Sequence, residues 1–190
     1  IQKLEDEPAI EFDNMNRAFN GLREDEYNPG HFEAWTAGRT GYPLIDACMR
    51  ALQQTGWINF RMRAMLISFA SYHLWLHWRQ PALHLARLFT DYEPGIHYSQ
   101  IQMQAGTTGI SALRIYSPVK QVFDQDPQGK FIRQWVPELM DVPDGFIAEP
   151  HRMPEPIQQR SGCIIDRDYP APIVDHLSAY RAAQKRMRAA

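Results

Sequence analysis

The spacing of apolar residues between Asn59 and Trp78 constrains the fold more than any other feature of the sequence. After the first two turns, apolar side chains recur on nearly all sides of a helix drawn through this segment, and this pattern predicts a buried central helix. The segment contains serines and histidines and falls short of the roughly 20 apolar residues that a bilayer span needs. We therefore expect a helix enclosed by other helices, and no membrane span.

Further helical patterns flank this segment. Residues 43–52 carry apolar side chains at a helical spacing, with Pro43 in the first turn and Gly56 just past the end, where these two residue types favour the start and the stop of a helix. No stretch alternates as a half-buried strand does, so we expect an all-α domain. The other helical patterns lie at about residues 81–89, 97–105, 118–124, 129–136 and 172–188.

The length of 190 residues predicts a single helical domain over residues 1–190. Residues 1–33 carry nine acidic side chains against three basic ones, so residues 1–30 are interpreted as an acidic lead-in. Residues 141–171 are rich in proline and are expected to form an irregular strap laid over the helices. The chain begins at Ile1 without a methionine or a basic segment, so we expect these residues not to be a signal peptide and the domain to be truncated on its N-terminal side.

Charge and cysteine content narrow the classes of partner. Residues 59–133 carry eight basic side chains against four acidic ones, so an anionic partner should meet the middle of the chain. The two cysteines, Cys48 and Cys163, are too few for a disulfide framework and favour a reduced, cytoplasmic protein.

Two histidines in the apolar stretch have a spacing that some metal ligands share. His73 and His77 are four residues apart, but no glutamate follows His73. We therefore expect both to be histidines of the core, and we expect no metal site.

Two arginines near the start of the central helix stand out. Arg61 and Arg63 are two residues apart and so face different sides of a helix. An arginine that turns inward needs a carboxylate partner, and Asp91, in a later turn, is the natural candidate. The pattern leaves two interpretations open: a structural salt bridge between a helix start and a loop, or one arginine that meets a phosphate or solvent. We predict a buried, charge-assisted pair between Arg63 and Asp91.

Eight motifs along the chain match a known signature. They are WTAGRTGYPLIDACMR (35–50), TGW (55–57), RMR (61–63), HW (77–78), Asp91, RIYSP (114–118), FIRQWVPEL (131–139) and YPAPIVDH (169–176). Over about residues 30–190 the sequence thereby resembles the photolyase/cryptochrome FAD-binding domain, and the length and spacing of the matches make chance an unsatisfactory explanation.

The resemblance implies an orthogonal helical bundle that holds a folded FAD with its flavin ring deep in the protein. It places Arg63 beside the flavin ring, with Asp91 as its carboxylate partner, and Glu93 near the edge of the ring that carries an N–H group. His97 stands where many photolyases have an asparagine that faces the ring. The resemblance thereby implies catalytic roles for Arg63, Asp91 and His97. The residues that it implies for binding the cofactor are these three together with Trp57 and Glu93.

The same resemblance implies that the protein binds DNA and that it contains an electron-transfer chain. Photolyases usually have the sequence His-Asn-Arg where this chain has Asn59-Phe60-Arg61, and the sequence Trp-Gln-Trp where it has Ile101-Gln102-Met103. The second change removes a tryptophan next to the flavin and an aromatic wall of the lesion pocket, whereas Trp78 keeps the middle position of the electron-transfer chain. The residues expected to contact DNA are Asn59, Phe60, Arg61, Met103 and Arg114.

The function implied for the whole protein is repair of UV-damaged DNA, in which light drives an electron from reduced FAD to a pyrimidine dimer. The losses at residues 59–61 and 101–103 leave two alternatives open: a cryptochrome-like photoreceptor without repair activity, or a degenerate module that no longer binds FAD. We also expect the isolated chain to be inactive, to retain FAD poorly and to be prone to self-association through the apolar face that missing helices would cover.

Overall fold

The computed structural model describes residues 2–110 and 113–189 and confirms an all-α fold. The described part of the chain contains no strand, and its one β-bridge is the isolated pair Ile165–Tyr169. The outer bounds of the expected domain, residues 1 and 190, lie outside the described residues. The α-helices are α1 (Gln2–Asp6), α2 (Pro29–Thr36), α3 (Pro43–Thr55), α4 (Phe60–Ser68), α5 (Arg79–Leu88), α6 (Pro94–Ala105), α7 (Pro118–Gln125), α8 (Lys130–Trp135), α9 (Glu155–Arg160) and α10 (His176–Ala189).

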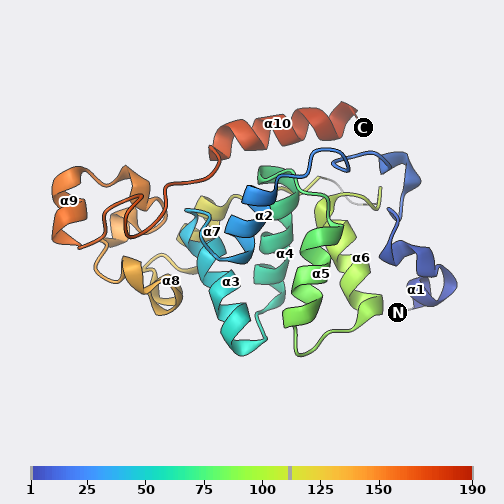
Figure 1. The fold of residues 1–190 in the computed structure, drawn as a ribbon, viewed down its shortest axis with the longest axis horizontal. Helices are drawn as coiled ribbons and strands as arrows, with labels where there is room; N and C mark the ends of the chain where they lie inside the picture. Colours follow the sequence, from blue (N-terminus) through green and yellow to red (C-terminus); the bar gives the residue numbers. More distant parts are fainter. Residues whose placement is uncertain (1, 111–112, 190) are drawn as a thin grey trace.

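The helices α3, α4, α5 and α6 form the centre of the bundle (Figure 1). Helix α3 packs against α2, α4, α7 and α8, while α6 packs against α1, α4 and α5. The last helix, α10, runs across this group rather than along it and contacts the segment that follows α4 (Figure 1). The crossing directions are those of the orthogonal bundle that the sequence predicts.

Helix α3 follows its sequence pattern closely. Pro43 occupies its first turn, and Gly56 ends it in the left-handed conformation at φ 70°. A side chain at Gly56 would lie 2.4 Å from the methyl group of Thr90, so glycine is required both by the backbone angle and by the packing. The apolar face of the helix, which includes Ile45 and Leu52, is fully buried.

The prediction of one continuous helix from Asn59 to Trp78 is wrong in its last part, after His73. Helix α4 ends at Ser68 and continues as a π-helical turn over Phe69–His73. The backbone then breaks, because Trp75 adopts a φ of 54°, which is costly for a bulky residue. The apolar pattern correctly indicates burial, but it does not reveal this break.

The ring of Trp75 explains why the strained conformation persists. Two guanidinium groups contact it, with the Cζ of Arg23 4.5 Å and that of Arg186 4.7 Å from the ring centroid. Its Nε1 donates a hydrogen bond to Glu26, which also forms an ion pair with Arg186 at 2.7 Å. We call these four residues the Trp75 clamp. Contacts of this kind are attractive, and they join the N-terminal segment to α10.

The N-terminal segment is held to α6 through one buried amide. The side chain of Gln102 donates to the carbonyl groups of Ile10 and Asp13, and its Oε1 accepts from the backbone N–H of Met15 and the hydroxyl of Thr107. All four hydrogen-bonding positions of the amide are thereby satisfied. The segment that the sequence marks as an acidic lead-in is therefore packed on the bundle.

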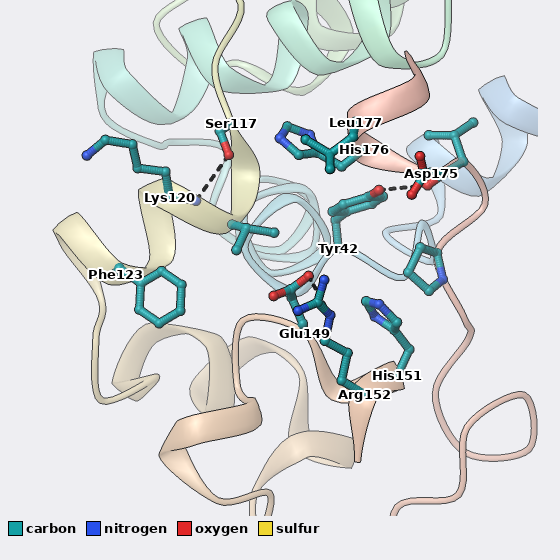
Figure 2. Close-up of a pocket in the computed structure, with 13 residues that line it drawn as sticks. Tyr42, Ser117, Lys120, Phe123, Glu149, His151, Arg152, Asp175, His176 and Leu177 are labelled. Atoms are coloured by element: carbon teal, nitrogen blue, oxygen red, sulfur yellow. Dashed lines mark hydrogen bonds and ion pairs between the residues drawn. The ribbon is translucent and has the colours of Figure 1, made fainter. Parts of the chain in front are cut away.

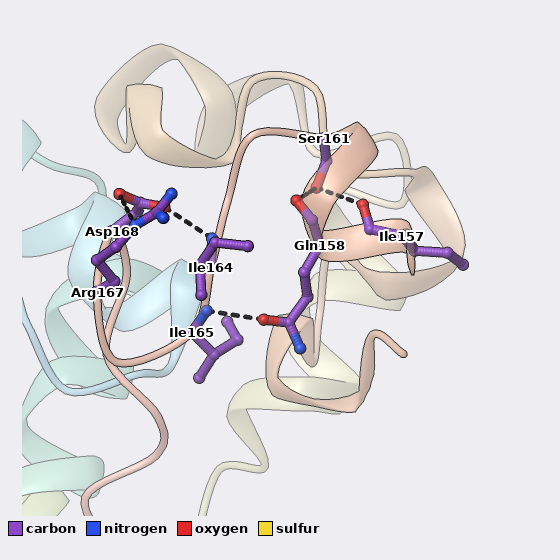
Figure 3. A network of polar contacts seen from close by, with 7 residues as sticks. All are labelled: Ile157, Gln158, Ser161, Ile164, Ile165, Arg167 and Asp168. Carbon is purple, nitrogen blue, oxygen red and sulfur yellow. Dashed lines mark hydrogen bonds and ion pairs between the residues drawn. The ribbon is translucent and has the colours of Figure 1, made fainter. Parts of the chain in front are cut away.

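Residues 141–171, expected to be an irregular strap, fold into short helices beside α3 and α8. They contain α9 and two 3₁₀ turns, and Ile147 and Cys163 are fully buried. Figure 3 shows how the end of this segment is fixed: the side chain of Gln158 accepts from the backbone N–H of Ile165, and Asp168 accepts from that of Ile164. The segment is thus ordered by its own polar contacts.

A buried carboxylate connects this segment to the bundle. Asp46, near the start of α3, is fully buried and accepts hydrogen bonds from the backbone N–H and the hydroxyl of Thr40, the N–H of Gly41 and the hydroxyl of Tyr169. Burial raises the pKa of Asp46, and the hydrogen bonds from Thr40 and Tyr169 oppose that shift. The network fixes the loop before α3 against a residue 123 positions away along the chain.

None of the helices in residues 2–110 and 113–189 is long and apolar enough to cross a membrane.

Candidate functional site

A small pocket opens between α4 and α6 and contains several of the residues that the sequence singles out. Its volume is about 90 Å³, and we call it the α4–α6 pocket. Its walls are mostly apolar, with one cationic and three other polar side chains among them. It is lined by Phe60, Arg63, Ala64 and Ile67 of α4, by Phe89, and by Ile96, His97, Gln100, Ile101 and Gln104 of α6.

Arg63 forms the ion pair that the sequence predicts. Its Nη2 lies 2.8 Å and 3.0 Å from the two carboxylate oxygens of Asp91, and its Nε donates to the carbonyl of Ile58 at 2.8 Å. The guanidinium group also lies over the ring of Phe89, 4.1 Å from its centroid. The backbone contact and the ring therefore fix its position at the pocket.

The expectation that this pair is buried is wrong. The side chain of Arg63 is 25% exposed and that of Asp91 is 48% exposed. The pair lies at the mouth of the pocket because the turn that carries Asp91 is at the surface. Its contribution to stability should follow the rules for exposed pairs, since water screens both charges.

Asp91→Asn is expected to lower the free energy of unfolding by only about 0.2–1 kcal/mol. The reason is that the carboxylate is half-exposed, while Arg63 keeps its hydrogen bond to the carbonyl of Ile58. Urea unfolding of the two proteins side by side measures the difference. A loss of about 3 kcal/mol or more would mean that the pair behaves as a buried one.

Glu93 and His97 are both engaged by the protein itself. The carboxylate of Glu93 caps α6, accepting from the N–H groups of Gly95 at 3.2 Å and Ile96 at 2.7 Å. His97 is buried, and its Nε2 lies 2.9 Å from the carbonyl of Ala82 in α5. The structure thus brings His97 to the pocket with Arg63, but uses Glu93 as a helix cap beside it.

The residues around the start of α4 divide between two sides. Trp57 and Phe60 are exposed, at 56% and 59%, and Phe60 faces the α4–α6 pocket. The Oδ1 of Asn59 caps α4 by accepting from the N–H of Met62 at 3.1 Å. Asn59 and Arg61 line a second hollow of about 170 Å³, which is bounded on its other side by residues 121–131. Residues 57–63 therefore do not surround a single pocket: Phe60 and Arg63 line the α4–α6 pocket, whereas Asn59 and Arg61 line the second hollow.

The remaining residues expected to contact DNA are spread along one stretch of chain. Arg114 is exposed and lines a shallow hollow together with Lys120 and Tyr180. Met103 lies half-buried on α6. Neither residue lines the α4–α6 pocket, so any contact that they make with a DNA lesion would lie outside this pocket.

Trp78 is fully buried, and its indole N–H donates to the Oδ1 of Asn14 at 2.7 Å. The ring of Tyr98 lies edge-on to it, with the centroids 6.4 Å apart, and Tyr98 in turn contacts the ring of His97 at 5.4 Å. A continuous set of aromatic rings therefore joins Trp78 to the wall of the α4–α6 pocket. Trp75, by contrast, is occupied by the arginines of the Trp75 clamp.

Comparison with known proteins identifies the family. The profile of the family described as the FAD binding domain of DNA photolyase matches residues 1–189. The chain belongs to this family. The match also takes in residues 1–30, which the motifs in the sequence do not reach, and a packed N-terminal segment agrees with this extension.

The relatives of this photolyase-family domain include both photolyases and a cryptochrome. The chain is 38% identical over 167 residues to a deoxyribodipyrimidine photo-lyase of Escherichia coli, covering 83% of the chain and 34% of the relative. It is 37% identical over 158 residues to a (6-4)DNA photolyase of Oryza sativa, covering 82% and 29%. It is 32% identical over 154 residues to a cryptochrome-1 of Aedes aegypti, covering 79% and 28%.

Solved structures agree with this assignment. A bacterial class III photolyase from Agrobacterium tumefaciens superposes with a TM-score of 0.89 at 32% identity, covering 99% of the chain and 40% of that protein. An archaeal photolyase from Sulfolobus tokodaii, solved with two FAD molecules, gives a TM-score of 0.85 at 33% identity, covering 98% and 41%. The photolyase-family domain described here thus spans less than half the length of each relative.

The α4–α6 pocket fits one edge of a flavin ring. Its apolar walls suit a flat aromatic ring, and Arg63 supplies a positive charge at the mouth. Sequence reasoning missed Gln100, whose Oε1 is buried without a hydrogen-bond partner among the described residues. A buried, unpaired amide oxygen at a pocket wall is unfavourable unless a ligand or water pairs with it. The residues present are therefore chemically suited to the polar edge of the cofactor of this family.

The size of the pocket limits that fit. Pockets that enclose a drug-sized ligand measure about 300–1,000 Å³, whereas the α4–α6 pocket measures about 90 Å³. The described residues can therefore hold part of a flavin ring and do not enclose a whole FAD molecule.

A larger pocket, of about 380 Å³, lies between α7 and the start of α10 (Figure 2). Its charged groups already have partners: Arg152 pairs with Glu149 at 3.1 Å, and Lys120 pairs with Asp124 at 2.6 Å. None of the residues expected to bind the cofactor lines it. It therefore carries no argument for the flavin site.

One residue of this pocket, His176, shares a hydrogen bond with the buried His73. His73 Nε2 and His176 Nδ1 are 2.8 Å apart, and the rings are stacked. Burial is the main cause that lowers the pKa of His73 to about 3, and the neighbouring His176 adds to the shift. His73 is buried, as expected for a histidine of the core.

Acid is therefore expected to destabilise the fold through His73. Its pKa is lower in the folded chain, about 3, than in the unfolded chain, about 6.5, so only the unfolded chain binds the proton between these values. Stability is complete above pH 6.5 and falls as the pH drops towards 3, with His73 contributing about 2 kcal/mol between pH 7 and pH 5. Urea unfolding at both pH values measures it. His73→Phe should show a correspondingly smaller loss, and an equal loss in both proteins would contradict the assignment.

Proposed function

We propose that this chain is the part of a light-driven DNA photolyase that binds the flavin ring of FAD. The observation that carries the proposal is the pairing of Arg63 with Asp91 at the mouth of an apolar pocket, beside the unpaired amide oxygen of Gln100. The relatives named as photolyases support the reaction class. FAD, when bound, reduced and excited by light, supplies the electron that splits a pyrimidine dimer.

The roles of the pocket residues follow from their geometry. Arg63 donates towards the ring edge and is kept in place by Asp91 and the carbonyl of Ile58. The apolar walls exclude water from that edge, which strengthens each polar contact. Glu93 acts indirectly, because it fixes the start of α6 and so the position of His97.

DNA that contains UV lesions is the proposed partner of the whole protein. Arg61 and Arg114 would meet phosphates, and Asn59, Phe60 and Met103 would lie nearer the lesion. Because phosphate contacts release counterions, affinity should fall steeply with salt. The excess of basic residues in positions 59–133 agrees with this footprint.

A second candidate is a cryptochrome-type photoreceptor that binds FAD but does not repair DNA. Ile101 and Met103 stand where the family has aromatic residues, and this substitution favours it. In that case Trp78 and Tyr98 would still offer an aromatic route to the pocket. The presence of a cryptochrome among the relatives is consistent with either candidate.

Two experiments test these proposals. Titration of FAD into the chain should give a dissociation constant weaker than about 1 µM, since the pocket contacts only a ring edge and the phosphates carry much of the binding. The whole protein that contains this sequence is then illuminated with blue light in the presence of dimer-containing DNA. Repair supports the photolyase, flavin photoreduction without repair supports the photoreceptor, and a whole protein that binds no FAD contradicts both.

A further inference from the structure

The pocket between α7 and the start of α10 is large enough for a small molecule. Its volume is about 380 Å³, within the range of about 300–1,000 Å³ that is usual for pockets that enclose small ligands. We call it the α7–α10 pocket. Val119, Phe123, Val174 and Leu177 form its apolar part, and Phe123 and Leu177 are 57% and 58% exposed. An apolar body in the pocket would remove these two side chains from water, which is favourable.

A hydrogen bond behind the pocket determines where two histidines carry their protons. His73 Nε2 lies 2.8 Å from His176 Nδ1, and the Nδ1 of His73 is buried without a partner among the described residues. Burial is the main cause that lowers the pKa of His73 to about 3, so this ring is neutral at pH 7 and carries one N–H group. Buried N–H groups without an acceptor are rarer in proteins than buried acceptors without a donor. His73 therefore carries its proton on Nε2 and donates it to His176.

The pairing makes His176 a hydrogen-bond donor at the pocket. Burial is the main cause that lowers the pKa of His176, while Asp175 and Glu149 oppose the shift, so this ring is also neutral at pH 7. Its Nδ1 accepts from His73, and its own proton must therefore lie on Nε2, which forms no hydrogen bond with the described residues. The stacking of the two rings, with centroids 5.0 Å apart, holds this N–H group in place.

Two further donors line the pocket beside His176. Figure 2 shows Ser117 and Lys120 on one side of this histidine. The Oγ of Ser117 accepts from the backbone N–H of Lys120 at 3.2 Å, which leaves the hydroxyl hydrogen free to donate. The ammonium group of Lys120 is paired with Asp124 one turn along α7, but the side chain of Lys120 is 69% exposed, and an exposed pair of this kind is weak enough to exchange for another anion.

The acidic side chains of the pocket have partners of their own. Glu149 pairs with Arg152 at 3.1 Å. Asp175 accepts from the backbone N–H of Ser178 at 2.8 Å, in the first turn of α10. Neither carboxylate forms a hydrogen bond with His176 in the described chain. The unused hydrogen-bonding capacity beside His176 is therefore that of donors, which suits a ligand with an anionic group.

We propose that the α7–α10 pocket is a binding site for a small molecule in which a carboxylate or phosphate group is attached to an apolar or aromatic body. The anionic group accepts from the Nε2–H of His176 and the hydroxyl of Ser117, near the ammonium group of Lys120, and the body lies on Phe123 and Leu177. The inference is independent of the proposed flavin site, because none of the residues expected to bind FAD lines this pocket.

The first test examines the two histidines without any ligand. Long-range ¹H–¹⁵N NMR spectra of the ¹⁵N-labelled chain distinguish the two neutral tautomers and the protonated ring of each histidine. The signals of His73 are assigned by their loss in His73→Phe, and those of His176 by their loss in His176→Asn. We expect a proton on Nε2 and none on Nδ1 in both rings at pH 7. A majority of the Nδ1–H form in either ring would overturn the inference.

The second test titrates benzoate and phenyl phosphate separately into the ¹⁵N-labelled chain, with the uncharged benzamide as the control ligand. Shifts of the backbone signals of Val119 and Leu177 report binding in the α7–α10 pocket. At least one of the two anions should bind with a dissociation constant of about 1 mM or tighter, and benzamide at least about tenfold more weakly. Comparison of the two anions shows whether the pocket prefers a carboxylate or a phosphate.

Three variants test the donors. In His176→Asn the amide oxygen can still accept from His73, but the Nε2–H group is lost, and affinity for the anion should fall about tenfold. Lys120→Met should weaken binding about threefold. Lys185→Met is the matched control for the charge, because Lys185 is exposed on α10 and does not line the pocket; its affinity should equal that of the unaltered chain.

Several results would overturn the site. They are the absence of any shift with either anion up to about 10 mM, equal binding of benzamide, shifts centred on the α4–α6 pocket instead, and unchanged affinity in His176→Asn. None of these results bears on FAD binding, which is measured separately.

Discussion

Replacement of Asp46 by alanine is expected to lower the free energy of unfolding by about 3–5 kcal/mol. The carboxylate is fully buried and accepts four hydrogen bonds from Thr40, Gly41 and Tyr169. Its removal leaves those donors unpaired in the core, and each buried, unpaired group costs about 1–3 kcal/mol. Urea unfolding followed by circular dichroism measures the loss.

The matched control for Asp46→Ala is Asp124→Ala. Asp124 forms an exposed ion pair with Lys120 one helical turn away, and such pairs contribute less than about 1 kcal/mol. Tyr169→Phe removes only one of the four donors and should give an intermediate loss. If Asp46→Ala and Asp124→Ala prove equally stable, the buried network does not anchor the segment that carries Tyr169.

Gln102→Ala should have the second large effect, with a loss of about 3–5 kcal/mol that falls mainly on the N-terminal segment. The amide pairs with the backbone of Ile10, Asp13 and Met15 and with the hydroxyl of Thr107. Without it, three backbone groups of the segment lose their partners. Hydrogen exchange of residues 10–15 should accelerate more than that of α3, which has no contact with the amide.

Gln104→Ala is the control for this experiment. Gln104 lies two residues along the same helix and faces the α4–α6 pocket, so its truncation leaves the N-terminal segment in place. Uniform acceleration of exchange across the whole chain in Gln102→Ala would show that the segment does not unfold separately. The prediction concerns the location of the loss as much as its size.

The sequence allowed much of the helical fold to be predicted, for identifiable reasons. Helix α3 is amphipathic and bounded by Pro43 and Gly56, so its limits were within a few residues of those observed. The same holds for α7, where Ser117 caps the first turn ahead of Pro118. Local signals of this kind act over a few residues and are visible without tertiary structure.

The break after α4 could not be predicted in this way. Apolar residues recur on nearly all sides between Phe69 and Trp78, so the pattern does not distinguish an α-helix from a π-helical turn. The strained backbone at Trp75 depends on Arg23 and Arg186, which are distant in sequence. Long-range contacts override local preference here.

The candidate site, too, could be predicted from the sequence only in part. The resemblance paired Arg63 with Asp91 correctly, and the structure places His97 beside them. The half-exposed state of that pair, the use of Glu93 as a helix cap and the unpaired amide of Gln100 all depend on how α4, α5 and α6 meet. Motifs identify which residues gather, but not which of their atoms remain free.

The Trp75 clamp has a consequence for the order in which the chain folds. Its polar contacts join residues that are 49 positions apart, from Trp75 to Glu26, and 160 positions apart, from Glu26 to Arg186. Closing loops of this length is entropically costly, and contacts between distant residues slow folding. The two ends of the chain should therefore dock last during refolding and separate first during unfolding, so the central helices would pass through an early stage in which α10 is still free.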